Sequence, residues 1–311
     1  MKRILVIRGG AIGDFILTLP AIRLVREKYP QAHIEILGYK HIAAVAENRF
    51  YAQAVRSIEY GPLARFFARD AELPAELCEY FQSFGLAISY LFDPDQIFER
   101  NVQRAGLRNF VSCSPKIEAH GHAARQLARP LGQLGLVWTG TATRLFPSPD
   151  DRQIAQTLLE AAPGRVIALH PGSGSEKKNW PLDQWLLLAK RFDRCNTASL
   201  LIVGGEADEE QVRAFRSAFV GRGIQFAENL PLPTLAAVLE KCALFVGHDS
   251  GISHLAAAVA TKCVLLFGPT DPAVWAPLGE NVRVVQAAPC ESMSNLSTEE
   301  VERACARFLR N

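Results

Sequence analysis

The sequence lacks the features that mark several large protein classes. Its seven cysteines are scattered through 311 residues without a C-x-x-C pair, so we predict neither a disulfide framework nor a zinc site. No apolar run approaches the roughly 18 residues of a membrane-spanning helix, and the first residues have neither the apolar core nor the cleavage site of a signal peptide. We therefore expect a cytoplasmic protein that is at most peripheral to a membrane.

Signals for nucleic-acid binding, metal chemistry and serine hydrolysis are also missing. The net charge is only +2 and no basic stripe alternates with aromatic residues, so we expect no nucleic-acid partner. No H-E-x-x-H motif occurs, and the spacing of His248 and His254 fits no metal site. Ser250 lacks the G-x-S-x-G setting of a hydrolase nucleophile. We predict no metal and no other cofactor.

What the sequence does contain is regular alternation of strands and helices. Apolar residues make up 49% and charged residues 21%, which is typical of a globular chain, and the length suffices for two domains of about 150 residues. Short apolar strands alternate with helical segments in two series, which predicts an α/β fold of two doubly wound domains facing a central cleft. Strands are expected at 3–8, 33–38, 54–59, 86–92 and 109–112, and then at 165–170, 199–203, 224–227, 243–247, 263–267 and 282–286.

The boundary between the two series is expected in a stretch rich in Thr, Pro and Asp at 138–150, so we predict domains at 1–148 and 149–311. A terminal helix at 298–310 is expected, with the hypothesis that it crosses back to the first domain. Residues 1–150 hold 18 Lys and Arg against 14 Asp and Glu, whereas residues 151–311 hold 16 against 18. The mildly basic first half suits an anionic partner or a membrane surface.

The most informative stretch is FVGHDSGISHLAAAVATKCVL at 245–265, where an apolar run is followed by a helix of small residues. Asp249 or Ser250 is expected to cap this helix, because their side-chain oxygens accept the free backbone N–H groups of a first turn. Those N–H groups and the helix dipole favour an anion just outside the helix, and Gly251 lets it approach the backbone. The alternative is an ordinary capped helix without a ligand.

The loop GGAIGD at 9–14 joins the first strand to the first helix. Its glycines do not form G-x-G-x-x-G, and the carboxylate of Asp14 would repel the phosphates of a dinucleotide, which argues against NAD. A carboxylate on a loop that faces a cleft is instead a candidate general base. The alternative is that Asp14 only caps the helix.

Two further loops follow strands in the second half. HPGSGSEKKNWP at 170–181 offers hydroxyl and unhindered N–H groups, with positive charge at Lys177 or Lys178. It has the composition of a phosphate cradle without being a P-loop, and a solvated turn is the alternative. GGEADEE at 204–210 offers carboxylates for ribose hydroxyls, although most of them are expected to be solvated. Because ligands of open α/β sheets bind outside the carboxyl ends of the strands, we expect the three second-half loops to converge on one nucleotide.

These blocks resemble glycosyltransferase family 9, the ADP-heptose:lipopolysaccharide heptosyltransferase family. The matching blocks, in the family's order, are RILVIRGGAIGDFILTLPAI, HPGSGSEKKNWP, LIVGGEADEE, and VGHDSGISHLAAA followed by LFGPTDP. The resemblance implies a GT-B architecture, in which a first Rossmann-like domain binds the acceptor and a second binds the nucleotide sugar. It also implies an inverting, metal-independent transfer of a heptose or related sugar. ADP-heptose is the favoured donor, and a lipopolysaccharide core or related glycan is the acceptor.

The resemblance further implies roles for single residues. Asp14 matches the acid taken as catalytic base, and Lys178 matches a position at the departing diphosphate. Among the acids of 206–210, Glu209 is the choice for the ribose. The positions implied to bind substrate are Gly13, Ser173, Ser175, Glu209, Asp249, Ser250, Gly251 and His254.

The acceptor side of the sequence is less informative. Residues 60–145, where the family's acceptor recognition lies, match no block, so both a lipopolysaccharide core and another glycan, lipid-linked or not, stay open as the acceptor. Contact of the basic first domain with the inner membrane is a further hypothesis. Two alternatives to a transferase remain open: a sugar-nucleotide epimerase or hydrolase of the same architecture, and a nucleotide-binding protein without catalysis. The presence of Asp14 argues against the second.

Overall fold

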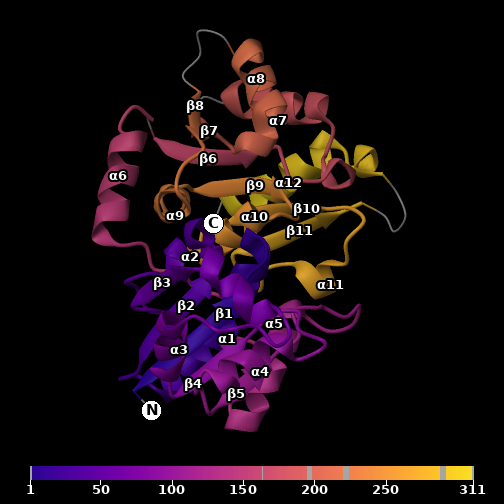
Figure 1. The fold of residues 1–311 in the computed structure, drawn as a ribbon. Coiled ribbons are helices and arrows are strands. Elements are labelled where there is room, and N and C mark those ends of the chain that lie inside the picture. The colour runs from indigo at the N-terminus through magenta and orange to yellow at the C-terminus, as the bar shows by residue number, and fades with distance from the viewer. Residues whose placement is uncertain (1, 163, 195–197, 220–223, 288–291, 310–311) are drawn as a thin grey trace. The chain divides into compact units, whose positions relative to one another are not determined.

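The chain forms two compact units, Met1–Thr141 (unit 1) and Ala142–Asn311 (unit 2). Figure 1 shows the computed structural model, which describes residues 2–162, 164–194, 198–219, 224–287 and 292–309. Each unit contains a parallel β-sheet with helices packed on it. This confirms the predicted α/β class of two doubly wound, Rossmann-like domains.

The sheet of unit 1 has the strand order β3-β2-β1-β4-β5, and every neighbouring pair is parallel. Its central strand is buried from Ile4 to Arg8, as expected for an apolar run covered on both faces. The strand order reverses between β1 and β4, so their carboxyl ends flank the topological switch point of this unit. The strands are β1 (Arg3–Arg8), β2 (His33–Gly38), β3 (Ala54–Ser57), β4 (Leu86–Ser89) and β5 (Phe110–Ser112).

Helices cover the two faces of this sheet separately. On one face, Leu5 and Ile7 of β1 pack in a cluster with Phe81 of α3 and Phe98 of α4. Helices α1 and α5 contact each other and contribute nothing to that cluster. Right-handed crossovers that leave a switch point in opposite directions place their helices on opposite faces. The helices are α1 (Ile12–Lys28), α2 (Lys40–Ala43), α3 (Ala75–Gln82), α4 (Ile97–Arg104) and α5 (Ala123–Ala128).

Unit 2 has a six-stranded parallel sheet of order β11-β10-β9-β6-β7-β8. All six strands lie within one residue of their predicted bounds. The order reverses between β6 and β9, which form the switch point of this unit. The strands are β6 (Arg165–His170), β7 (Ala198–Gly204), β8 (Gln225–Glu228), β9 (Leu244–His248), β10 (Cys263–Phe267) and β11 (Val282–Gln286).

Around this sheet, α7, α8 and α12 share one core cluster that includes Trp185, Phe215 and Val301. Helix α10 packs against β9, β10 and α9, and α6 packs against α9 (Figure 1). The helices are α6 (Pro149–Leu159), α7 (Leu182–Arg194), α8 (Glu209–Ala218), α9 (Leu232–Glu240), α10 (Gly251–Ala258), α11 (Pro272–Trp275) and α12 (Thr298–Leu309).

The division between the units lies at 141/142, a few residues before the predicted 148/149. The stretch expected as a linker is attached to unit 2, because the N–H of Leu145 donates to the carbonyl of Ala258 at 2.8 Å. It ends in a helix that the sequence analysis missed: Ser148 caps α6, Pro149 occupies its first turn, and Asp151 completes a capping box.

The terminal helix α12 packs on its own unit. It contacts α7, β9, β10 and β11, and Glu302 pairs with Arg191 of α7 at 2.7 Å. This replaces the hypothesis that the terminal helix crosses back to the first domain. The amphipathic pattern predicted the helix but not the sheet that its apolar face covers.

Candidate functional site

Three loops of unit 2 meet at the carboxyl ends of its central strands. The loop 171–180 follows β6, residues 249–250 follow β9, and residues 205–208 follow β7, the other neighbour of β6. His170 pairs in register with Gly247, so β6 and β9 end side by side. Because the connections from these two strands leave in opposite directions, the space above them is where an open α/β sheet binds a ligand.

A lysine and an aspartate pair across this point. Lys178, in the short 3-10 turn Glu176–Lys178, donates from Nζ to Asp249 Oδ2 at 2.7 Å. The Thr270 hydroxyl donates to the same oxygen at 2.7 Å. The side chain of Asp249 is 9% exposed and that of Lys178 is 29% exposed. The aspartate is therefore enclosed by its donors, while the ammonium group keeps an open side for an anion.

The first turn of α10 lies next to this pair. Ser250 caps the helix, accepting the Ser253 N–H at 3.4 Å, which decides between the two predicted capping residues. Gly251 is the first helical residue. The unpaired N–H groups of a first turn and the helix dipole stabilise negative charge at such a position.

The loop 171–180 is closed by its own side chains. The Ser173 hydroxyl lies 2.8 Å from the carbonyl of Ser175 and 2.6 Å from Asn179 Oδ1, so its hydrogen is directed within the loop. Gly174 has φ +72° and open space around it, a conformation that favours glycine. The Ser173 hydroxyl therefore shapes the loop. If Ser173 binds a phosphate as expected, its backbone N–H is the donor that remains.

Among the acids of 206–210, Asp208 is the one that the fold encloses. Its carboxylate accepts the Gly205 N–H at 2.9 Å and lies 3.3 Å from His170 Nε2. Burial by itself would raise the pKa of Asp208, but the hydrogen bond and charge of His170 and the Gly205 N–H bring it below its ordinary value. A Cβ added to Gly172 would lie 1.5 Å from Asp208 Oδ1, so this acid packs directly on the loop. Glu209, the predicted ribose ligand, is exposed at the start of α8.

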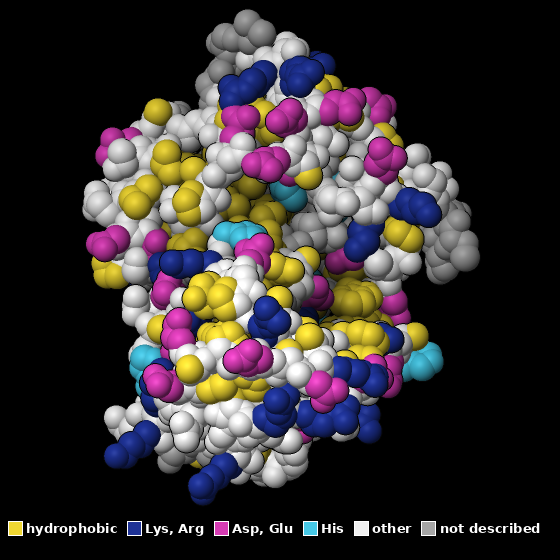
Figure 2. Space-filling view, viewed as in Figure 1, with side chains coloured by type: hydrophobic (Ala, Val, Ile, Leu, Met, Phe, Trp, Pro, Cys, Tyr) yellow, Lys and Arg dark blue, Asp and Glu magenta, His cyan; other side chains and the backbone are white. Residues whose placement is uncertain are grey.

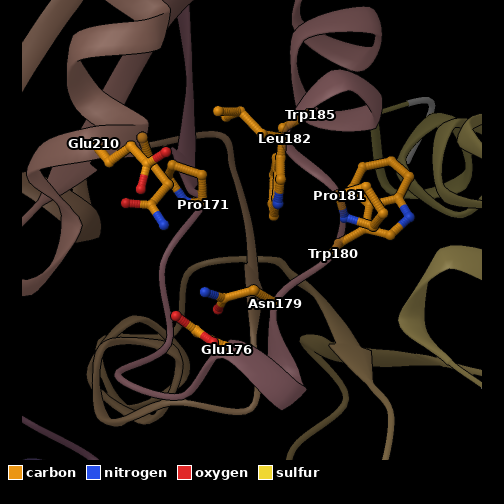
Figure 3. Close-up of a pocket in the computed structure, with 9 residues that line it drawn as sticks. Pro171, Glu176, Asn179, Trp180, Pro181, Leu182, Trp185 and Glu210 are labelled. Atoms are coloured by element: carbon orange, nitrogen blue, oxygen red, sulfur yellow. The ribbon is translucent and has the colours of Figure 1, made fainter.

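A pocket of about 220 Å³ lies beside the loop 171–180. Figure 3 shows Trp185 reaching from α7 towards the loop, with Pro171 on one side and Trp180 and Pro181 on the other. Both tryptophans are almost completely buried, and the Trp180 indole N–H donates to the carbonyl of Leu296 at 2.9 Å. The C-terminal half of the loop is thus held by aromatic packing.

In unit 1, Asp14 lies in the first turn of α1, beside the switch point of its own sheet. Its Oδ2 accepts the Ala11 N–H at 3.0 Å, and its Oδ1 lies 3.6 Å from the Arg8 guanidinium. The Asp14 side chain is 37% exposed and that of Arg8 is 3% exposed. Gly10 has φ +96°, and a Cβ there would lie 2.8 Å from Asp14 Oδ2. The carboxylate therefore caps the helix and also remains open to solvent.

Arg8 contacts both the main chain and the carboxylate of Asp14. Its guanidinium donates to the main-chain carbonyl of Asp14 at 3.2 Å and lies 5.9 Å from the ring centroid of Tyr90, at the end of β4. Burial lowers the pKa of Arg8, and the charge of Asp14 partly opposes this. A buried guanidinium of this kind fixes the carboxylate in place.

A family model matches more than half of the chain, including the three loops of unit 2 but not Arg8 and Asp14 of unit 1. The model of glycosyltransferase family 9 (heptosyltransferase) matches residues 116–305. The chain belongs to glycosyltransferase family 9. It is accordingly an enzyme that transfers a glycosyl group, as the resemblance implied.

Individual relatives of this glycosyltransferase are similar over most of their length. Lipopolysaccharide heptosyltransferase 3 of Escherichia coli K12 is 23% identical over 298 residues, covering 87% of this chain and 83% of that protein. Lipopolysaccharide heptosyltransferase 1 of Pseudomonas aeruginosa is 26% identical over 318 residues, covering 93% and 85%. The solved structure of E. coli ADP-heptose lipopolysaccharide heptosyltransferase II superposes with a TM-score of 0.79 at 20% identity, over 100% of this chain and 99% of that one. This structural likeness shows a shared GT-B fold.

The predicted residues of the glycosyltransferase fall into two groups. Those of unit 2 lie on the loop 171–180, at the start of α8 and along 249–254, where His254 is buried within α10. Gly13 and Asp14 lie in unit 1, in the first turn of α1. Their roles towards a substrate stay predictions.

Several residues of the site are not among those expected from the sequence. They are Arg8, His170, Asp208 and Thr270, together with His248, which was weighed only as a metal ligand. The signals were a polar residue at the end of an apolar strand, for Arg8 and His170, and the hydroxyl in the GPTDP block, for Thr270. None of these signals states which partner the side chain meets.

Proposed function

We propose that this glycosyltransferase transfers a heptose or related sugar, with inversion and without a metal ion, from a nucleotide-diphosphate sugar to a glycan of the lipopolysaccharide core. ADP-heptose is the donor that we favour. Support comes from relatives that carry the name lipopolysaccharide heptosyltransferase and from the E. coli structure named for ADP-heptose.

The observation that carries the proposal is the Lys178–Asp249 pair beside the start of α10, at the switch point of unit 2. As the sugar leaves, negative charge grows on the diphosphate. A partly exposed ammonium group and the N–H groups of a helix start are donors suited to that charge, and fixed donors aimed at developing charge are usually the largest catalytic contribution. The enclosed Asp249 would keep Lys178 in place between turnovers.

The proton of the acceptor would go to Asp14. In the proposed step, the acceptor hydroxyl oxygen bonds to the anomeric carbon, its proton passes to the Asp14 carboxylate, and the bond from that carbon to the phosphate oxygen breaks. The electron pair leaves with the nucleoside diphosphate. Attack from the face opposite the leaving group inverts the configuration through an oxocarbenium-like transition state. Oδ1 of Asp14 is the better placed oxygen, because Oδ2 already accepts the Ala11 N–H.

The surface of unit 1 bears on the proposed contact with a membrane. Figure 2 shows Lys and Arg side chains, with Asp and Glu interspersed, among hydrophobic ones on the face of this unit turned to the viewer. A pocket of about 250 Å³ in unit 1 is lined by Arg69, Arg100 and Arg104, together with Asp70, Ile97 and Asn101. Among the described residues, no helix is long and apolar enough to cross a membrane. We propose peripheral contact with the cytoplasmic face of the inner membrane, and failure to pellet with anionic liposomes at low salt would count against it.

The test of the function is calorimetric binding of ADP, UDP, GDP and dTDP in the presence of a metal chelator. Wild type, Lys178→Ala and the matched control Lys177→Ala are compared, because the control removes the neighbouring positive charge without touching the Asp249 pair. We expect wild type to bind ADP more tightly than the other three nucleotides. Lys178→Ala should bind ADP at least about tenfold more weakly than wild type, and Lys177→Ala should bind it with nearly the wild-type affinity.

Other outcomes separate the alternatives. Preference for another base would keep a glycosyltransferase and discard ADP-heptose as donor. Turnover of a nucleotide sugar at full rate without any acceptor would favour an epimerase or hydrolase. Binding of none of the four nucleotides would contradict the proposal.

A further inference from the structure

His248, the last residue of β9, is fully buried, yet both of its ring nitrogens have partners. Nδ1 lies 3.2 Å from the carbonyl oxygen of Gly172, and Nε2 accepts the backbone N–H of Trp180 at 2.8 Å. The indole N–H of Trp185 points to the same Nε2 at 3.3 Å. One side chain therefore contacts both ends of the loop 171–180 and the first turn of the helix that follows it.

These partners permit one protonation state of the ring. A backbone amide and an indole nitrogen are donors only, so Nε2 must accept from Trp180 and Trp185. A carbonyl oxygen only accepts, so the ring proton lies on Nδ1 and is donated to Gly172. A proton added to Nε2 would face two donors. The packing of Trp185 edge-on to the imidazole, with ring centroids 5.2 Å apart, fixes the same ring orientation.

The charged and titratable groups around His248 do not change this assignment. They are His170 at the end of β6, Asp208 in the segment after β7, and Asp249, its neighbour in the chain. Burial is the dominant effect and lowers the pKa of His248 to about 4, with smaller opposing effects from the Gly172 carbonyl and the two acids. The imidazole is therefore neutral at neutral pH.

The loop has other attachments, and each holds a different part of it. Asp249 holds the Lys178 side chain, Asp208 packs on Gly172, and the Trp180 indole N–H donates to the Leu296 carbonyl. His248 connects the two ends of the loop to each other through β9, the strand that also presents Asp249. Ordering the residues of an irregular loop costs backbone conformational entropy, so a loop whose ends are fixed in advance binds its ligand at a smaller ordering cost.

We propose that His248 is a positioning residue: as the neutral Nδ1–H tautomer it bonds to Gly172 and Trp180 and so presets the loop 171–180 for a nucleoside diphosphate. This rests on the proposed function, because the diphosphate is the ligand that the preset loop serves. His248 is buried and does not itself touch the ligand. A histidine that served only stability would leave the nucleotide affinity of the folded protein unchanged, whereas a positioning residue alters it.

Three variants distinguish these two roles. His248→Leu removes both bonds, whereas His248→Gln places an amide oxygen near the position of Nε2, where it can still accept the Trp180 N–H. Val301→Ala shortens a fully buried side chain of α12 and serves as the matched destabilised control. ADP binding is measured by calorimetry without metal, and thermal unfolding is followed on the same samples.

We expect ADP to bind His248→Leu about 10- to 100-fold more weakly than wild type, which is the range for losing a buried hydrogen-bonded pair. His248→Gln should recover part of the affinity, and Val301→Ala should bind like wild type in spite of a lower melting temperature. If His248→Leu does not fold, His248→Asn replaces it, since the shorter amide reaches Gly172 but not Trp180, and a partial loss is expected.

Failure of the inference is distinguishable from failure of the proposed function. Wild type that binds no nucleoside diphosphate would overturn the proposed function and the inference with it. Wild type that binds ADP, together with a His248→Leu or His248→Asn variant that binds it equally well, would overturn the inference alone. Nitrogen-15 NMR of the wild-type imidazole needs no variant: a proton found on Nε2 at pH 7 would also overturn it.

Discussion

The ammonium group of Lys178 lies 2.7 Å from the carboxylate of Asp249, although 71 positions separate them in the chain. Thr270 donates a second hydrogen bond to the same carboxylate oxygen. The pair brings together a loop after β6 and a turn after β9, the two strands at which the sheet reverses its order. The contact therefore depends on the strand order, and it directs a cation to the place where this fold binds ligands.

Lys178→Ala should destabilise the protein by about 1–3 kcal/mol, because it leaves the enclosed Asp249 without its counter-charge. The double variant Lys178→Ala/Asp249→Asn should recover part of this loss, since the amide carries no charge and can still accept from Thr270. Urea unfolding of the two single variants, the double variant and wild type gives the coupling energy. Additive losses would show that the pair contributes nothing.

Asp14→Asn should lower glycosyl transfer by about 10²- to 10⁴-fold, the usual contribution of a general base. The amide can still accept the Ala11 N–H, so the melting temperature should change little. ADP affinity should be unaffected, because Asp14 belongs to unit 1. Glu27→Gln, which changes an acid paired with Arg23 in the same helix, is the matched control and should keep full activity. Near-normal turnover of Asp14→Asn would remove Asp14 from the mechanism.

Because of His248, the free energy of unfolding should fall as the pH is lowered from about 6.5 to about 4. Burial lowers its pKa from 6.5 to about 4 in the folded protein. Between these values the unfolded chain binds a proton that the native state excludes, so the contribution is complete above pH 6.5 and is lost as the pH falls through the folded pKa. This difference between the unfolded and folded pKa corresponds to a loss of at most about 3 kcal/mol in the free energy of unfolding.

Urea unfolding of wild type and His248→Gln at pH 7, 5.5 and 4.5 measures this contribution. Other titrating groups are common to both proteins and cancel in the difference. We expect wild type to lose stability relative to His248→Gln as the pH falls. A difference that stays constant with pH would show that His248 is not held neutral.

Gly172→Ala should destabilise unit 2 by about 1–3 kcal/mol through overpacking. The new methyl group would lie 1.5 Å from Asp208 Oδ1, and that carboxylate is held by His170 and Gly205. Gly132→Ala is the control, because a Cβ there meets nothing within 4 Å. Asp208→Ala introduced into Gly172→Ala should recover part of the loss. An unchanged midpoint of urea unfolding for Gly172→Ala would contradict the close packing.

Local sequence patterns predicted the strands well because their cause is local. The apolar runs of β6, β9 and β10 are buried on both faces, so they read as continuous hydrophobic segments that end in Gly or a polar residue. Helix α6 was missed for the opposite reason. Its SPDD start fits both a loop and the capped first turn of a helix, and packing against α9 and the Arg152–Glu240 ion pair favour the helix.

The sequence by itself determined the two α/β series, the family blocks and the residue types at the strand ends, since each depends on neighbours along the chain. The tertiary structure decided the partners: Ser250 rather than Asp249 as the cap, Asp208 rather than Glu209 against the loop, and His248 bonded to residues 68 and 76 positions away. The His248 bonds follow from β6 and β9 lying side by side, and the Asp208 contact follows from β7 lying beside β6. The strand order sets that adjacency through packing of the whole sheet, and no local pattern encodes it.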